Sequence, residues 1–283
     1  VVHKRLLPTY DVFDEDRYFE PGPPSKPVVL DGRRLGVTIC EDVWHEDGPV
    51  RTMAQQGAGL IINISASPFH AGKAEMRAEV VSRAARTNSV PIAYVNLVGG
   101  QDELVFDGQS MVVDEHGRVI AGAARFEEDL LVVDVEVRPS GPVGTANAVR
   151  IEAPCAPDEK PVLRHRRLPP HLSPEEEVYA ALVMGVADYA RKNGFQKAVI
   201  GLSGGIDSSL VATIATDALG AENVVGVSMP SVYTSRESEE DARELAENLG
   251  IHFLTIPIEP VRRVFLSSLR EAFRTLPPGI AEE

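Results

Sequence analysis

One stretch, AVIGLSGGIDSS at residues 198–209, constrains the fold more than any other part of the sequence. Its first residues, AVIGL, are apolar without alternation, which predicts a short strand buried on both faces. A serine and two glycines then break the pattern, and an apolar-periodic helix is predicted to begin near Ser208. N–H groups at a helix start have no intrahelical acceptor and favour negative charge. This order of strand, glycine turn and helix therefore predicts an anion site.

The residue types in the turn are those that a phosphate chain requires. Gly204 and Gly205 let the backbone approach a ligand closely, and the neighbouring serines add hydroxyl donors. Asp207 is the one carboxylate in the stretch. Because Mg²⁺ beside a polyphosphate is held by one or two carboxylates, Asp207 is the predicted metal ligand.

A glycine turn before a helix is not specific by itself, because many Rossmann-like crossovers use one for packing alone. The stretch lacks the lysine of a Walker loop and the spacing of a dinucleotide fingerprint. SGGIDSS instead resembles the pyrophosphate loop of the ATP pyrophosphatases, which include synthetases for NAD, GMP, asparagine and argininosuccinate and tRNA-thiolating enzymes. The resemblance implies ATP and Mg²⁺ as cofactors, adenylation of a carbonyl or carboxylate oxygen, and release of pyrophosphate. The ATP-binding residues that it implies are Gly201, Leu202, Ser203, Gly204, Gly205, Ile206, Asp207 and Ser208.

Composition narrows the class of protein. A chain of 283 residues with 43% hydrophobic residues predicts one or two globular domains. The formal charge of −14 argues against a broad nucleic-acid surface. No apolar run reaches the roughly 18 residues of a membrane span, and the first residues are not a signal peptide. Two cysteines, Cys40 and Cys155, form no disulfide or zinc pattern. We therefore expect a cytoplasmic protein with no nucleic-acid or membrane partner.

The predicted fold class is α/β in two parts. Residues 1–138 contain a hairpin at 27–31 and 34–40, a helix at 74–87, and strands in PIAYVNLVG, SMVVDEHGRVIAG and LLVVDVEV. Buried strands with a helix and later hairpins predict a mixed α/β sandwich. Residues 139–172 are proline-rich and aperiodic, which is typical of a domain linker.

Residues 173–283 alternate helices and strands, which predicts a doubly wound parallel sheet with helices on both faces. A helix begins at the S-P-E-E pattern of Ser173, and another runs from about Ser235 to Asn248, closed by Gly250. The strands NVVGVSM and IHFLTIPI flank that second helix. Ligands bind at the carboxyl ends of strands in such sheets, which is where the 201–208 loop lies.

Cys40 is the candidate nucleophile of the first part. A cysteine at the end of a buried strand is usually a small core residue. TICEDVW, however, places two acids directly after it, and Lys4 lies among apolar residues that would carry it inward. Hydrolysing a carboxamide needs a thiolate, a cation or N–H groups for the oxyanion, and a base. Cys40 and Lys4 can supply the first two.

Four blocks in order make the function more specific: HKRLLPTYDVFDEDRYFEPG, GVTICEDVW, NISASPFHAGK and GGQDELVFDGQS. They resemble the nitrilase-type glutaminase domain of the glutamine-dependent NAD synthetases, and the similarity continues through MPSVYTSRESEEDARELAENLG. A nitrilase-like sandwich followed by an ATP pyrophosphatase domain is the fold implied. The resemblance implies Cys40 as nucleophile and Lys4 as oxyanion-side lysine. It also implies that Tyr10, Ser67 and Lys73 bind glutamine, with Glu41 as a further polar contact.

The reaction that the resemblance implies uses L-glutamine, ATP and nicotinic acid adenine dinucleotide to make NAD. The family's glutamate base lies upstream of the lysine, and this sequence begins too late to contain it. The parts that grip adenine and the nicotinic acid nucleotide lie largely beyond residue 283. We therefore expect a fragment with both ends incomplete. We also expect a homo-oligomer, of a size that the sequence leaves open.

Two other functions remain open from the sequence. One is a stand-alone amidase of the nitrilase type whose second domain only binds nucleotide. The other is a non-catalytic nucleotide-binding or scaffold protein in which Cys40 is a core residue. The presence of Lys4, Cys40 and SGGIDS together argues against the second.

Overall fold

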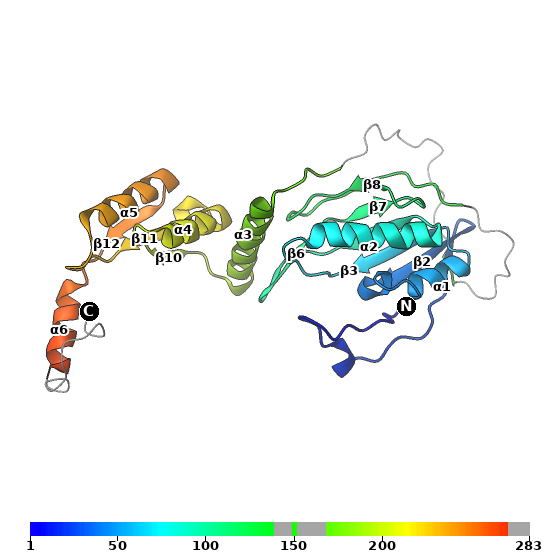
Figure 1. Cartoon of the computed structure of the whole chain (residues 1–283), viewed down its shortest axis with the longest axis horizontal. Coiled ribbons are helices and arrows are strands. Elements are labelled where there is room, and N and C mark those ends of the chain that lie inside the picture. Colours follow the sequence, from blue (N-terminus) through cyan, green and yellow to red (C-terminus); the bar gives the residue numbers. More distant parts are fainter. Residues whose placement is uncertain (139–148, 152–167, 271–283) are drawn as a thin grey trace. The chain divides into compact units, whose positions relative to one another are not determined.

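The computed structural model describes residues 1–138, 149–151 and 168–270 (Figure 1). The chain divides into two compact units, Val1–Ala181 and Leu182–Glu283. The domain limits at 138 and 173 stay predictions. Most of the predicted linker and residues 271–283 lie outside the described residues, as does Cys155. Within the described part, no helix has the length and apolar character needed to cross a membrane.

The first unit is built on a seven-stranded mixed sheet with the order β8-β7-β4-β3-β2-β1-β9. Its strands are β1 (Val28–Leu30), β2 (Arg33–Ile39), β3 (Leu60–Ser65), β4 (Ile92–Asn96), β7 (Met111–Val113), β8 (Val119–Gly122) and β9 (Val149–Ile151). The predicted hairpin is confirmed, because β1 and β2 pair antiparallel. Strands β2, β3 and β4 are parallel. Strand β9, which lies within the predicted linker, pairs with β1 in parallel.

Helices α1 (Pro49–Gln55) and α2 (Lys73–Asn88) pack on one face of this sheet (Figure 1). Both contribute to a single buried cluster, in which Met53 and Val81 meet Ile61 and Ile92 from the strands. Gly36 is required where α1 crosses β2, because a Cβ there would lie 2.8 Å from the Cβ of Met53. The predicted helix over 74–87 is confirmed as α2, and it delivers Lys73 at its first position.

Short elements complete the first unit. They are the 3-10 helices η1 (Glu15–Arg17) and η2 (Cys40–Val43) and a hairpin of β5 (Val98–Gln101) and β6 (Leu104–Asp107). PIAYVNLVG, predicted as one strand, ends at Asn96 and resumes at Val98 in a different sheet. The strand predicted at 130–137 is wrong, because a strand requires a hydrogen-bonded neighbour, which apolar alternation does not supply.

The second unit contains a parallel sheet with the order β10-β11-β12. Its elements are β10 (Ala198–Gly201), α4 (Ile206–Leu219), η4 (Ala221–Asn223), β11 (Val224–Ser228), α5 (Arg236–Leu249), β12 (His252–Thr255) and α6 (Glu259–Leu269). Helix α3 (Pro174–Asn193) precedes them, and the division between the units falls inside it. The predicted alternation of strands and helices is confirmed, and Gly250 ends α5 with a φ of 68°.

Both connecting helices of this sheet lie on the same face. Ala212 of α4 and Ala246 of α5 are buried in one cluster with Val224 of β11. Right-handed crossovers between strands in sequential order place successive helices on one side of a sheet, which explains this arrangement. Helices on both faces were predicted; in the described residues, α4 and α5 cover one face.

Candidate functional site

Cys40 lies directly after the last residue of β2 and begins η2. Its backbone has a φ of 46°, a left-handed conformation that is uncommon outside glycine and is often found where a side chain is held for function. The Asp42 carboxylate accepts a hydrogen bond from the Ile39 N–H at 3.0 Å, which closes this turn. Asn63 of β3 donates to the Cys40 carbonyl at 3.4 Å. The sharp turn thus presents a buried thiol at the carboxyl end of a central strand.

Lys4 is held beside this turn by backbone contacts. Asp42 also accepts hydrogen bonds from the N–H groups of Arg5 and Leu6, at 3.1 and 3.0 Å. The N-terminal segment is therefore bound to η2, although it is 36 or 37 residues away in sequence. The Lys4 ammonium donates to both carboxylate oxygens of Glu15, at 2.6 and 2.5 Å. Only 16% of the Lys4 side chain is exposed, so the pair is largely shielded from water.

The thiol of Cys40 has a raised pKa. Burial is the largest cause, because it disfavours the charged thiolate. The charge of Lys4 and a hydrogen bond from the Ala66 N–H lower the pKa, whereas Glu41 and Glu15 raise it further. The thiol is therefore protonated at neutral pH, so a base must remove its proton before it can attack a carbonyl.

Glu41 connects Tyr10 to the same site. Its buried carboxylate accepts hydrogen bonds from the Tyr10 hydroxyl at 3.0 and 2.9 Å. The Nε2 atom of His45 lies 3.3 Å from the same carboxylate. Partial burial raises the pKa of Tyr10, and the hydrogen bond to Glu41 raises it further. Tyr10 therefore stays a neutral donor, with part of its ring exposed.

Lys73 approaches the site from α2. Its ammonium lies 4.6 Å from the ring centroid of Trp44, which follows η2 directly. Burial lowers the pKa of Lys73, and the charge of Arg77 lowers it further, whereas Asp11, Glu41 and Cys40 act in the opposite direction. The Lys73 charge is thus within range of the Cys40 thiol and of the Glu41 carboxylate.

Ser67 occupies a buried turn after β3. Its N–H donates to the Asn96 side chain at 2.9 Å. It follows Ala66, whose N–H reaches the thiol of Cys40. The residues predicted for the first site, Lys4, Tyr10, Cys40, Ser67 and Lys73, therefore come together from separate segments.

Three residues at this site have roles that the sequence analysis did not identify. Glu15 pairs with Lys4, Asp42 ties the N-terminal segment to η2, and Asn63 supports the Cys40 carbonyl. The pair of acids after Cys40 was a usable signal for Asp42. Glu15 stands in an acid-rich loop, DEDRYFE, where sequence alone does not distinguish one carboxylate from the next.

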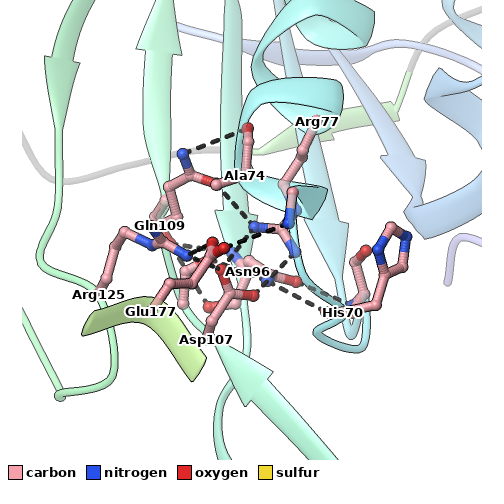
Figure 2. Close-up of polar contacts among 12 residues, drawn as sticks. His70, Ala74, Arg77, Asn96, Asp107, Gln109, Arg125 and Glu177 are labelled. Atoms are coloured by element: carbon pink, nitrogen blue, oxygen red, sulfur yellow. Dashed lines mark hydrogen bonds and ion pairs between the residues drawn. The ribbon is translucent and has the colours of Figure 1, made fainter. Parts of the chain in front are cut away.

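A buried group of charges supports the start of α2 (Figure 2). Arg77 and Asp107 are fully buried and form two hydrogen bonds, at 3.1 and 2.9 Å. Arg125 bonds to Asp107 at 3.4 Å and forms a short ion pair with Glu177 of α3. Glu177 also accepts a hydrogen bond from the Gly72 N–H at 3.2 Å. Two cations and two anions thus balance each other beside Lys73.

The second candidate site is the loop between β10 and α4. Leu202 is buried in the core of the second unit, so it anchors the loop by packing. Gly204 has a φ of 79°, and a Cβ there would lie 2.4 Å from the Ser238 carbonyl oxygen. The structure therefore requires glycine at 204 for packing against α5, whatever the loop binds. Gly205 has an extended backbone with a φ of −92°.

Serine hydroxyls organise the loop into a compact turn. Ser203 accepts a hydrogen bond from the Gly205 N–H at 3.2 Å and lies 3.1 Å from the Ser208 hydroxyl. Ser208 donates to the Gly205 carbonyl at 3.0 Å. Helix α4 begins at Ile206, two residues before the predicted start at Ser208. Its first-turn N–H groups have no intrahelical acceptor, which is the geometry that the predicted anion site requires; anion binding at this turn stays a prediction.

Asp207 is exposed in the first turn of α4. No group of three or more His, Cys, Asp or Glu side chains suited to a metal occurs among the described residues. Mg²⁺ commonly takes one or two carboxylates and completes its shell with phosphates and water. A single exposed carboxylate beside this turn fits Mg²⁺ only together with a bound polyphosphate.

Comparison with known proteins covers both units. Residues 2–141 match the carbon-nitrogen hydrolase family, and residues 178–279 match the NAD synthase family. A glutamine-dependent NAD(+) synthetase of Thermotoga maritima is 48% identical over all of this chain and 51% of that protein. One from Aquifex aeolicus is 43% identical, over all of this chain and 52% of that protein. The chain thus spans about half the length of the curated relatives it matches.

Solved structures agree with these matches. The glutamine-dependent NAD(+) synthetase of Acinetobacter baumannii, in complex with adenosine diphosphate, is 35% identical with a TM-score of 0.83. The alignment covers 99% of this chain and 49% of that one. The enzyme of Cytophaga hutchinsonii, at 20% identity and a TM-score of 0.72, shares the fold. Because a carbon-nitrogen hydrolase region is followed by a NAD synthase region across nearly the whole chain, the chain belongs to the family of glutamine-dependent NAD(+) synthetases.

Proposed function

We propose that the protein containing this chain makes NAD by amidating nicotinic acid adenine dinucleotide with ammonia taken from L-glutamine. One ATP is consumed and leaves as AMP and pyrophosphate. The observation that carries the proposal is the grouping of Lys4, Tyr10 and Lys73 around the buried thiol of Cys40, with Ser67 directly after the residue whose N–H reaches that thiol. The glycine turn that starts α4 lies downstream in the same chain.

In the first half-reaction, a base takes the thiol proton of Cys40, and the sulfur attacks the side-chain carbonyl carbon of glutamine. The C–N bond then breaks, ammonia leaves with the thiol proton, and water hydrolyses the thioester to glutamate. Lys4 stabilises the thiolate and the developing oxyanion, and Glu15 holds its ammonium in place. Tyr10, Ser67 and Lys73 bind the remainder of glutamine, and Glu41 orients the Tyr10 hydroxyl.

In the second half-reaction, the carboxylate of the nicotinic acid moiety attacks the α-phosphorus of ATP, and pyrophosphate leaves. Ammonia then attacks the adenylated carbonyl and displaces AMP to form the amide. The 201–208 turn binds the phosphates through backbone N–H groups, and Asp207 would hold Mg²⁺. Bound Mg²⁺ would neutralise the charge of the phosphates.

The test is a single substitution in the protein expressed from its complete reading frame. Cys40→Ala should abolish NAD synthesis driven by glutamine and leave synthesis driven by added ammonium unchanged, because the two reactions use separate sites. Cys155→Ala is the matched control and should alter neither rate. Loss of both activities in Cys40→Ala would instead identify Cys40 as structural. Amide hydrolysis without any ATP-dependent NAD formation would favour the stand-alone amidase.

A further inference from the structure

We propose that Glu177 is a positioning residue for the glutamine site: its carboxylate holds the turn that starts α2 and thereby positions the Lys73 side chain. The inference rests on the proposed function, because it concerns the glutamine contact of Lys73. Glu177 follows the proline-rich segment 139–172 in the sequence, whereas the other residues of the glutamine site precede that segment.

The contacts of Glu177 are specific and shielded from water. Only 7% of its side chain is exposed, although it lies in the first turns of α3 beside the exposed Glu175 and Glu176. One carboxylate oxygen pairs with Arg125, and the other accepts the Gly72 N–H at 3.2 Å. Figure 2 shows Glu177 reaching the charge cluster from a separate segment of chain. Both oxygens are therefore engaged, which fixes the orientation of the carboxylate.

Gly72 is the residue where this contact reaches the site. It caps α2 with a φ of 77°, and Lys73 is the first residue of the helix. The Lys73 N–H donates to the His70 carbonyl at 2.9 Å, so the turn from His70 to Lys73 is closed at both ends. Glu177 holds the peptide just before Lys73. A displacement of this turn therefore moves the base of the Lys73 side chain.

The buried charges give the first turns of α2 a second anchor. Arg77, one turn after Lys73, forms two hydrogen bonds with Asp107, which Arg125 also contacts. Arg77 and Arg125 are balanced by Asp107 and Glu177. Removing the Glu177 charge would leave two buried cations against one anion. Because Arg77 already opposes the Lys73 charge, the imbalance would act on the same side chain.

The direction of the effect follows from this geometry. Lys73 lies over Trp44 and within range of Cys40, whereas the Glu177 carboxylate contacts Arg125 and Gly72. A residue that only positions a substrate contact changes binding more than it changes the chemical step. Glu177, Gly72 and Lys73 all lie in the first unit, Val1–Ala181.

The experiment measures glutamine hydrolysis by the protein expressed from its complete reading frame. Glu177→Gln should raise the KM for glutamine roughly tenfold, with kcat within about twofold. Glu175→Gln, the same change on the exposed side of the same helix, should leave both constants within about twofold. NAD synthesis from added ammonium should be unchanged in both variants. Protection of Cys40 from alkylation by glutamine should require about tenfold more ligand in Glu177→Gln.

A KM in Glu177→Gln equal to that in Glu175→Gln would overturn the inference. So would a parallel fall of glutamine-driven and ammonium-driven synthesis, which indicates a general structural role. If Glu177→Gln fails to fold, Glu177→Asp replaces it, because the shorter side chain keeps the charge but cannot span Arg125 and Gly72. Its KM should rise several-fold, and an unchanged value overturns the inference. Absence of glutamine hydrolysis in the unmodified protein would remove the proposed function, and this inference with it.

Discussion

The two candidate sites of this chain are built in opposite ways. The Cys40 site joins side chains that are far apart in sequence, has a buried thiol, and lies near a buried pair of opposite charges. The loop at 201–208 is continuous in sequence and mostly exposed, and its own hydroxyl and backbone groups organise it. The difference fits the chemistry that we propose for the two sites. The reactivity of a cysteine nucleophile depends on its pKa, which several surrounding groups set. A phosphate chain binds to backbone N–H groups, which the start of a single helix already provides.

The largest expected effect is that of a substitution at Lys4, which should change the reaction with glutamine but not the reaction with ammonium. Lys4→Met should lower kcat/KM for glutamine by roughly 10² to 10³, because it removes the cation beside the thiolate and the oxyanion. Synthesis from ammonium should be unaffected, since the second site is separate. Lys26→Met, at an exposed lysine, is the control. Equal losses with glutamine and ammonium would contradict a separation of the two sites.

The next effect concerns the packing of the loop. Gly204→Ala should destabilise the second unit by about 2 kcal/mol, because alanine is strained at a φ of 79° and its Cβ meets α5. Gly205→Ala should cost less than about 1 kcal/mol, since its backbone is extended. Urea unfolding of the 283-residue chain measures this. The single tryptophan, Trp44, reports on the first unit, so its fluorescence transition should stay in place while the circular dichroism transition shifts.

The pH dependence of Cys40 alkylation tests the buried charges of the first site. Because burial raises the pKa of Cys40, its thiolate fraction at pH 7 should be below that of glutathione. The alkylation rate should rise about tenfold per pH unit and level off only above the usual cysteine range. Lys4→Met should move the midpoint to higher pH, because Lys4 lowers this pKa. A midpoint near pH 7 would contradict the burial of the thiol.

The smallest effect is expected within the loop itself. Ser203→Ala should weaken ATP binding two- to fivefold by calorimetry, since one hydroxyl is lost and the backbone N–H groups remain. Thr213→Ala, which removes a hydroxyl that bonds within α4 away from the turn, is the control. A loss of more than about a hundredfold in Ser203→Ala would show that side chains, not the backbone, hold the phosphates.

Much of the second unit could be predicted from the sequence. The helices, the parallel strands and the turn at 201–208 follow from local periodicity and from the residues that begin and end helices. Helix α4 begins at Ile206, two residues before the predicted start at Ser208, because the last residues of the turn already have helical geometry. In the first unit, the apolar pattern at 130–137 predicts a strand that the structure does not contain, because a pattern does not show whether a neighbouring strand exists.

The sequence by itself determined the chemistry available to this protein: a cysteine after a strand, a lysine among apolar residues, and a glycine turn before a helix. Each of these features is local, because it lies within a short continuous segment of the sequence. Only the tertiary structure decided that Glu15 pairs with Lys4, that Gly204 serves the packing of α5, and that Glu177 reaches the start of α2. Such contacts depend on which strands pair and which helix faces meet. Periodicity specifies the buried face of an element but not the residue that it meets there.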